Sequence, residues 1–213
     1  SGVALIIDYI LTIAISISAA SDSLFSLLPL NLQPFNVYFK LLLVIILTIL
    51  NLRGMKESIK VMMPIFLGFV LTHFALLCYG FSAHYDRVSL VVKGAISETH
   101  QLHTSMGWLA VFLILFKAYS LGGGTYTGLE AVSNNVDVLK EPRVKTGKWT
   151  MLYMAISLSL TAGGITLLYM IWHVQSIPGQ TYNAILFSKM LGTSSLGHFS
   201  LIVTLLFEVG ILF

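Results

Sequence analysis

Three oxygen-bearing side chains follow one another at four-residue intervals near the start of the sequence. Asp8, Thr12 and Ser16 lie within an apolar stretch, and this spacing places them on one face of an α-helix. We call these three residues the Asp8 stripe; Tyr9 flanks it. A carboxylate inside a membrane-spanning helix costs about 2.5–3.5 kcal/mol to insert, so it normally faces a cavity or a partner. One carboxylate and two hydroxyls offer hard oxygen ligands, which suit a monovalent cation, an ammonium group or a proton.

Two plainer interpretations of the Asp8 stripe remain open. Asp8 can lie at the headgroup boundary, where a carboxylate is hydrated at little cost. Thr12 and Ser16 can bond the carbonyls of their own helix, as such hydroxyls often do.

A second group of polar residues surrounds three consecutive glycines. The group contains four glycines, two threonines and one acid: Gly122, Gly123, Gly124, Thr125, Thr127, Gly128 and Glu130. Each glycine costs about 1 kcal/mol relative to alanine in a helix, so the run predicts a break in the helix. Irregular backbone within a membrane must be buried or line a cavity, and the exposed helix ends there bind ions and polar substrates. Tight helix packing, or a helix that simply ends outside the bilayer at Gly122, are the alternatives.

The elements that must position these groups are membrane-spanning helices. The sequence of 213 residues is 56% hydrophobic and 10% charged, with a net charge of +3 and a mean hydropathy of +0.87. Spanning a bilayer takes about 20 apolar residues. Five segments and a truncated sixth come near that length, giving about five and a half spans at residues 3–28, 37–52, 59–81, 108–121, 149–172 and 199–213. The intervening stretches 82–105 and 173–198 are predicted to be loops.

These features predict an all-α, polytopic membrane helix bundle in which residues 1–213 form one transmembrane domain of a longer protein. We expect an integral, multi-pass protein of the plasma (inner) membrane. The stretch from Trp108 to Leu121 is too short to span alone, which favours a broken helix over a simple helix end. Glu208, in the last apolar segment, is a candidate second buried acid, and His73 is expected to be a hydrogen-bonded packing residue.

Several function classes are disfavoured by the sequence. There is no GxxxxGK[ST] nucleotide motif and no HExxH zinc motif, and Cys78 is the single cysteine. We therefore expect no enzymatic activity, no cofactor, no nucleic-acid partner and no metal other than a transported potassium ion.

Four short blocks carry a family resemblance. They are residues 8–12 (DYILT) with Ser16, residues 51–58 (NLRGMKES), residues 127–134 (TGLEAVSN) and residues 141–143 (EPR). In these blocks the sequence resembles the amino acid–polyamine–organocation (APC) superfamily, in its KimA-type potassium-importer branch. The likeness extends from about residue 2 to residue 172, and the block ending in Glu-Pro-Arg is its most specific part.

The resemblance implies a LeuT-like fold of two inverted five-helix repeats, with alternating access around a midplane site at the broken first and sixth helices. The chain would correspond to about helices three to eight, without the first two and the last four. The cation site that the resemblance implies contains Asp8, Tyr9, Thr12, Ser16 and Thr127. Glu130 would serve proton coupling or stabilise the helix break.

The polar residues within apolar helices and the family resemblance together lead us to expect secondary active transport, namely proton-coupled uptake of potassium by alternating access. A proton-coupled amino-acid permease is the first alternative, and a channel or a structural membrane subunit is less favoured. The expected partners are potassium or an amino acid, protons, the lipid bilayer and, in a homodimer, a second copy of the protein.

Overall fold

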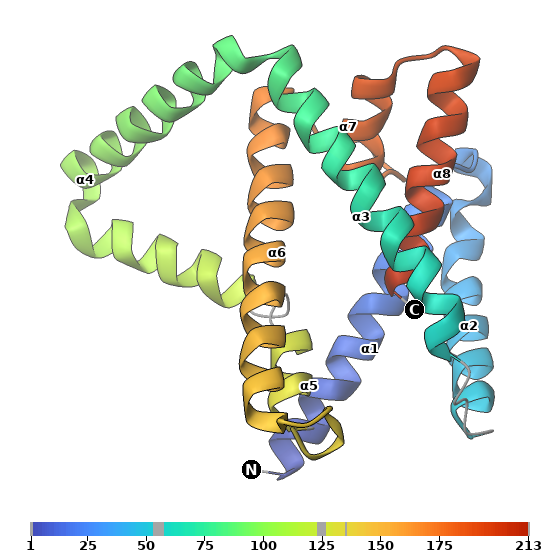
Figure 1. The fold of residues 1–213 in the computed structure, drawn as a ribbon. Helices are drawn as coiled ribbons and strands as arrows, with labels where there is room; N and C mark the ends of the chain where they lie inside the picture. Colours follow the sequence, from blue (N-terminus) through green and yellow to red (C-terminus); the bar gives the residue numbers. More distant parts are fainter. Residues whose placement is uncertain (1, 53–57, 123–126, 135, 213) are drawn as a thin grey trace. The chain divides into compact units, whose positions relative to one another are not determined.

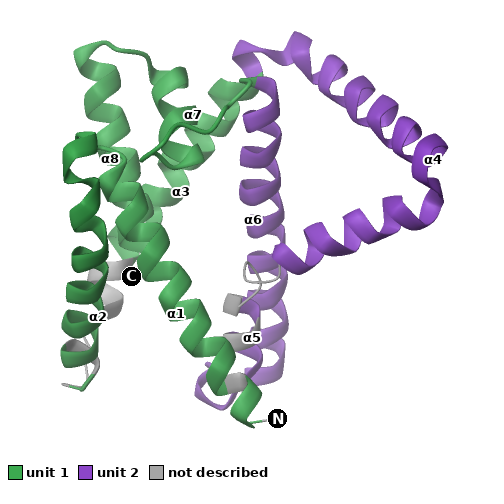
Figure 2. Ribbon diagram, turned by 180° about the vertical axis from the view of Figure 1, so that it is seen from behind, with its two compact units in different colours: residues 1–81, 172–213 green, residues 82–171 purple. Residues whose placement is uncertain are grey.

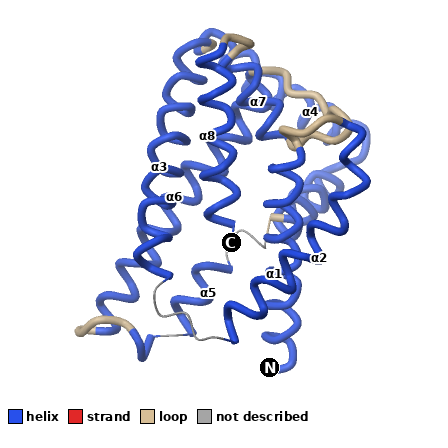
Figure 3. The backbone as a smooth tube through the Cα atoms, turned by 90° about the vertical axis from the view of Figure 1, so that its right-hand side faces the viewer, coloured by secondary structure: helices blue, strands red, loops and turns tan. Residues whose placement is uncertain are grey.

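The computed structural model describes residues 2–52, 58–122, 127–134 and 136–212. Every regular element in these ranges is a helix (Figure 3). The chain divides into two compact units, which are described separately: unit 1 contains residues 1–81 and 172–213, and unit 2 contains residues 82–171 (Figure 2).

Unit 1 holds the two ends of the chain. Its elements are α1 (Gly2–Phe25), the short 3-10 helix η1 (Leu30–Phe35), α2 (Asn36–Leu52), α3 (Ser58–Ala83), α7 (Tyr182–Leu191) and α8 (Ser195–Leu212). The boundary between the units falls within the last turn of α3, after Phe81. In Figure 1 the blue α1 and the red α8 come from opposite ends of the sequence. They nevertheless pack against each other, and α7 packs against α8.

Unit 2 is built from the middle of the chain. Its elements are α4 (Tyr85–Leu121), α5 (Thr127–Asn134), the 3-10 helix η3 (Val136–Val138) and α6 (Arg143–Ile171). The long α6 contacts α4, α5 and η3.

Within the described residues, six helices are long and apolar enough to cross a membrane. Their mean hydropathy lies between 1.5 and 2.2 over the spans Gly2–Phe25, Leu30–Ile49, Met63–Ala83, Tyr85–Leu121, Arg143–Ile171 and Ser195–Leu212. Large apolar side chains are widely exposed on them; Leu71, Leu109 and Phe116 are 68%, 72% and 68% accessible. Because such surfaces are stable in hydrocarbon rather than water, the chain is an integral, multi-pass membrane protein. The prediction of an all-α polytopic fold is confirmed.

The predicted loop at residues 82–105 was wrong, because α4 is helical from Tyr85. Polar residues within it, such as Glu98 and Gln101, lower the hydropathy but are good helix formers. Gly107, with φ 79° and ψ 171°, then interrupts the helix, and a second arm begins at Trp108 as predicted. Only glycine adopts this backbone conformation without strain. Figure 1 shows the two arms of α4 meeting at an angle.

The predicted loop at residues 173–198 was also wrong, because it contains α7. The Thr181 hydroxyl caps this helix by accepting a hydrogen bond from the Ala184 N–H at 3.3 Å. Ile185, Leu186 and Phe187 are 0–3% exposed, so the helix is held by its buried side chains. Ten residues are too few to span a membrane, which is why a search for spans missed it.

The core of unit 1 lies where α1, α3, α7 and α8 meet. Ala20, Leu186 and Leu205 are fully buried there. Two glycines allow α3 and α8 to approach closely: Gly68 lies against the ring of Phe207, and a Cβ added to Gly210 would lie 2.7 Å from Ile65. Close glycine contacts of this kind are common between membrane helices. Burying apolar side chains gains little there because lipid is itself apolar, so close van der Waals packing holds the helices together.

Candidate ion-binding site

The Asp8 stripe lies on the more buried face of α1. Asp8, Thr12 and Ser16 are half-buried, whereas Ile6 and Ile10 on other faces of the helix are each 60% exposed. Tyr9, beside the stripe, is half-buried as well. The polar face of α1 is thus less exposed than the apolar face that carries Ile6 and Ile10, as expected of a functional acid within a membrane.

The predicted helix break falls largely outside the described residues. The first part of the expectation is visible: α4 ends at Leu121, and Gly122 caps it with its N–H bonded to the carbonyls of Ala118 and Ser120. Gly123, Gly124 and Thr125 lie outside the described residues. The next helix, α5, begins at Thr127.

The remaining predicted ligands are placed only in part. Gly128 and Glu130 lie in α5 after Thr127, but the side chains of Thr127 and Glu130 lie outside the described residues. Because α1 and α5 belong to different units, the meeting of the Asp8 stripe with Thr127 stays a prediction.

The polar face of α1 extends beyond the predicted stripe. After Ser16 the same three- and four-residue spacing continues through Ala19, Ser23 and Ser26, all of which project on the same side of the helix. Ser23 is fully buried, and Ser26 binds Thr181. The sequence contained this signal, because small and polar residues recur at helical spacing to the end of α1.

Glu208, the candidate second acid, lies in the core of unit 1, where the residue is half-buried and its Oε2 is buried. The Asn183 side-chain amide donates to Glu208 Oε1 at 3.0 Å. The other oxygen, Oε2, is buried and has no hydrogen-bond partner of regular geometry among the described residues. Ser23 of α1 lies beside this carboxyl, close enough to act as a hydrogen-bond donor to it, although its buried Oγ makes no hydrogen bond of regular geometry with the described residues. Three helices therefore place one acid and two neutral polar side chains together.

His73 of α3 is buried near this core and is 1% exposed. Its Nδ1 lies 3.0 Å from the carbonyl oxygen of Phe69, and its ring packs on Phe69 at 3.9 Å between centroids. The edge of the ring meets Phe187 at 5.4 Å. These contacts agree with the expected packing role, although Nε2 has no hydrogen-bond partner.

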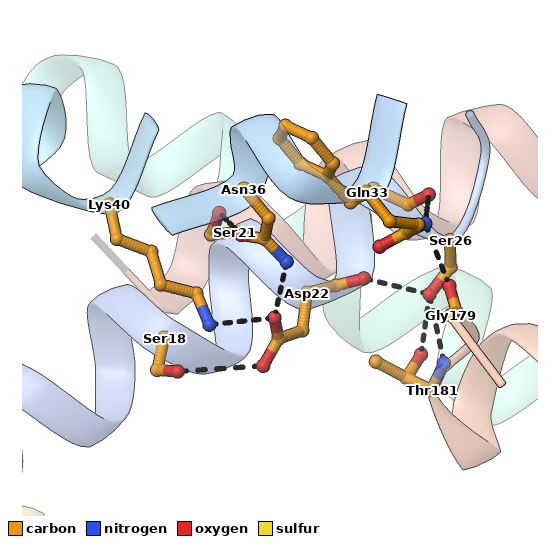
Figure 4. A network of polar contacts seen from close by, with 10 residues as sticks. Ser18, Ser21, Asp22, Ser26, Gln33, Asn36, Lys40, Gly179 and Thr181 are labelled. Atoms are coloured by element: carbon orange, nitrogen blue, oxygen red, sulfur yellow. Dashed lines mark hydrogen bonds and ion pairs between the residues drawn. The ribbon is translucent and has the colours of Figure 1, made fainter. Parts of the chain in front are cut away.

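A network of polar contacts holds the C-terminal end of α1 (Figure 4). Asp22 Oδ1 lies 2.8 Å from the Lys40 ammonium and accepts a hydrogen bond from the Asn36 amide at 2.7 Å. Ser18 donates to the other carboxylate oxygen at 3.4 Å, and Ser21 donates to Asn36. The carboxylate therefore has a cationic partner, in contrast to Glu208.

The same end of α1 is tied to the chain before α7. Ser26 Oγ accepts a hydrogen bond from the Thr181 N–H at 2.8 Å. Gln33 donates to the Phe25 carbonyl at 2.9 Å and to the Gly179 carbonyl at 3.1 Å (Figure 4). The bond to Phe25 reaches one of the last carbonyls of α1, and the other two tie this end to the chain before α7, so the helix that carries the Asp8 stripe is anchored at one end.

The chain is similar to the potassium transporter KimA of Bacillus subtilis (strain 168). The two share 34% identity over 197 residues, which cover 90% of this chain and 31% of KimA. The chain thus spans about a third of the length of KimA. No model of a protein family matches the sequence.

The similarity to KimA agrees with the membrane-spanning character of the six helices. It also agrees with the sequence-based resemblance to KimA-type importers. A monovalent cation is therefore the ligand class against which the oxygen-rich face of α1 is best tested.

Proposed function

We propose that this chain belongs to a secondary active transporter that carries potassium across the membrane. The half-buried Asp8 stripe, in a chain 34% identical to a potassium transporter, is the observation that carries the proposal. Asp8, Thr12 and Ser16 supply only oxygen atoms, and oxygen ligands are the ones that replace the hydration shell of potassium. An amino acid needs in addition donors for its carboxylate and room for its side chain.

One helix cannot surround a cation, so further ligands must come from other elements. In this proposal Tyr9, Thr125 and Thr127 complete the site with backbone groups near Gly122, Gly123, Gly124 and Gly128. The C-terminal end of α4 at Gly122 favours a cation, because unpaired carbonyls there carry partial negative charge. An ion held between α1 and the segment around α5 can be exposed alternately to each side of the membrane.

The proposal includes an APC-type, LeuT-like architecture, uptake coupled to protons and location in the plasma (inner) membrane. Glu130, three residues after Thr127 on α5, is the candidate for the coupling acid at the site itself. The proposed activity is transport without catalysis and without a cofactor. A homodimer is the proposed assembly, and the mass of the purified complex tests it.

The test is uptake into vesicles that contain the full-length protein. With an inward proton gradient, the proposal predicts accumulation of potassium above its equilibrium level and its loss on addition of a protonophore. Labelled amino acids should neither accumulate nor compete. Accumulation of an amino acid without potassium would replace the proposal by an amino-acid permease. Potassium flux that only follows its own gradient would indicate a channel.

A further inference from the structure

The Glu208 carboxyl is the described acid of unit 1 whose surroundings least suit a negative charge. It lies in a membrane-spanning helix, and its Oε2 is buried without a hydrogen-bond partner. Among the described residues it forms no ion pair, whereas Asp22 on α1 binds Lys40. A buried carboxylate without a cation is costly, and it commonly becomes neutral instead.

The helices that pack on α8 carry few groups that could offset such a charge. Among the side chains that the structure describes in α1, α2, α3, α7 and α8, the titratable groups besides Glu208 are Asp8, Tyr9, Asp22, Tyr38, Lys40, His73, Cys78, Tyr79, Tyr182, Lys189 and His198. Lys189 donates to the His173 carbonyl at 2.8 Å. His73 is buried against Phe69 and makes no ion pair with Glu208.

Asp8 and the exposed members of this set are not placed to act on Glu208. Asp8 is 15 residues from Ser23, which is about 22 Å along the helix. Tyr38, Cys78, Tyr79, Tyr182 and His198 are exposed. Among the described residues, the polar side chains beside the carboxyl are the neutral ones of Asn183 and Ser23.

A single proton on Glu208 would allow Glu208 Oε2 and Ser23 Oγ to form a hydrogen bond with each other. As a carboxylic acid, Glu208 would donate from Oε2 to the Ser23 oxygen and accept from the Asn183 amide at Oε1. The Ser23 hydroxyl could then donate to a carbonyl of its own helix. As a carboxylate, Glu208 could accept from both neighbours, but the charge would remain buried without a cation.

We propose that Glu208 is a proton-binding site: its carboxyl holds a proton when α1, α7 and α8 are packed as seen here. Protonation takes H⁺ from water and forms the O–H bond on Oε2, and the reverse step returns H⁺ to water when this packing opens. If the protein transports potassium as proposed, uptake and release of this proton would make potassium uptake depend on pH. That consequence rests on the proposed transport function, whereas the protonation itself does not. Glu208 lies on α8, apart from the Asp8 stripe, so it is not proposed as a potassium ligand.

Infrared spectroscopy of the full-length protein in vesicles tests the protonation directly. The wild type minus Glu208→Gln difference spectrum at neutral pH should contain the C=O stretch of a carboxylic acid. That band should move to lower frequency in D₂O and to higher frequency in Ser23→Ala, which removes the acceptor of the O–H group. Glu98→Gln, at an exposed glutamate of α4, should not change the band. Carboxylate stretches in place of the acid band would overturn the proposal.

The pH dependence of potassium uptake tests the coupling. Glutamine keeps one acceptor and one donor at this position, so Glu208→Gln should fold with a thermal midpoint near that of the wild type. The ratio of its uptake rates at about pH 6 and about pH 8 should fall below that of the wild type, because one of the two proposed titrating groups is gone while Glu130 remains. Glu98→Gln should keep the wild-type ratio, and a Glu208→Gln variant that also keeps it would refute the coupling role.

The two experiments separate the possible failures. A protein that shows the acid band but moves no potassium would remove the proposed function and leave the proton site. A protein that moves potassium with Glu208 ionised would remove the proton site and leave the proposed function.

Discussion

Gly68 of α3 packs directly beneath the ring of Phe207 in α8, and a Cβ at this position would overlap the ring. This contact sets how closely the two helices approach in unit 1. Gly68→Ala should therefore force the ring or the helices to move, at a cost of about 1–3 kcal/mol in unfolding free energy. Denaturant- or detergent-induced unfolding of the purified protein measures this loss.

Gly163→Ala is the matched control for this change. A Cβ at Gly163 of α6 meets nothing within 4 Å, so we expect no loss of stability and a gain of up to about 1 kcal/mol from the better helix former. Equal effects of the two substitutions would show that the contact with Phe207 does not limit helix approach.

The ion pair between Asp22 and Lys40 should contribute only modestly to stability. The two charges lie 2.8 Å apart, but the Lys40 and Asp22 side chains retain 27% and 43% of their exposure. Partly exposed pairs contribute about 0.2–1 kcal/mol. A double-mutant cycle with Asp22→Asn and Lys40→Met should give a coupling energy in that range. A coupling energy near zero would mean that Asn36, rather than Lys40, holds the Asp22 carboxylate.

Thr181 should stabilise the start of α7 through its side-chain cap. Its hydroxyl accepts from the Ala184 N–H, and its own N–H donates to Ser26. Thr181→Ala should cost about 0.5–2 kcal/mol for the lost cap. Thr181→Ser retains the hydroxyl and should recover most of this stability in thermal unfolding. No recovery with serine would assign the effect to the threonine methyl group.

Loss of the Thr12 hydroxyl should weaken potassium binding without changing the fold. Thr12→Val keeps the shape of the side chain but removes one proposed ligand oxygen. A lost contact of about 1.4 kcal/mol corresponds to a tenfold change. We therefore expect the apparent KM for potassium uptake to rise about tenfold. Thr48→Val on α2, where the exposed threonine bonds its own helix at Val44, should leave the KM unchanged. A similar KM in both variants would remove Thr12 from the site.

Much of the fold follows from the sequence because hydropathy reports directly on membrane burial. The spans near Gly2–Phe25 and Arg143–Ile171 were predicted to within a few residues at most ends. Hydropathy failed where a helix is polar or short. The first arm of α4 contains polar helix formers such as Glu98 and Gln101, and α7 is stabilised by burying residues such as Phe187 against other helices. Neither property appears in a local average.

From the sequence, only those candidate site residues that lie on one helix could be placed relative to one another. Four-residue spacing identified Asp8, Thr12 and Ser16 on one face of α1, and the structure places all three on its half-buried face. The partnership of Glu208 with Asn183 could not be found in this way. These residues lie on different helices, and only tertiary packing brings them within hydrogen-bond distance.

The most direct test of the proposed function is the initial rate of potassium uptake by Asp8→Asn in vesicles of the full-length protein. Asparagine has nearly the same size as aspartate, so the variant should fold, while the loss of the negative charge from the site should lower uptake at least tenfold. Asp137→Asn, at an exposed aspartate of η3, should transport at the wild-type rate. Wild-type potassium uptake by Asp8→Asn would contradict the proposed site on α1.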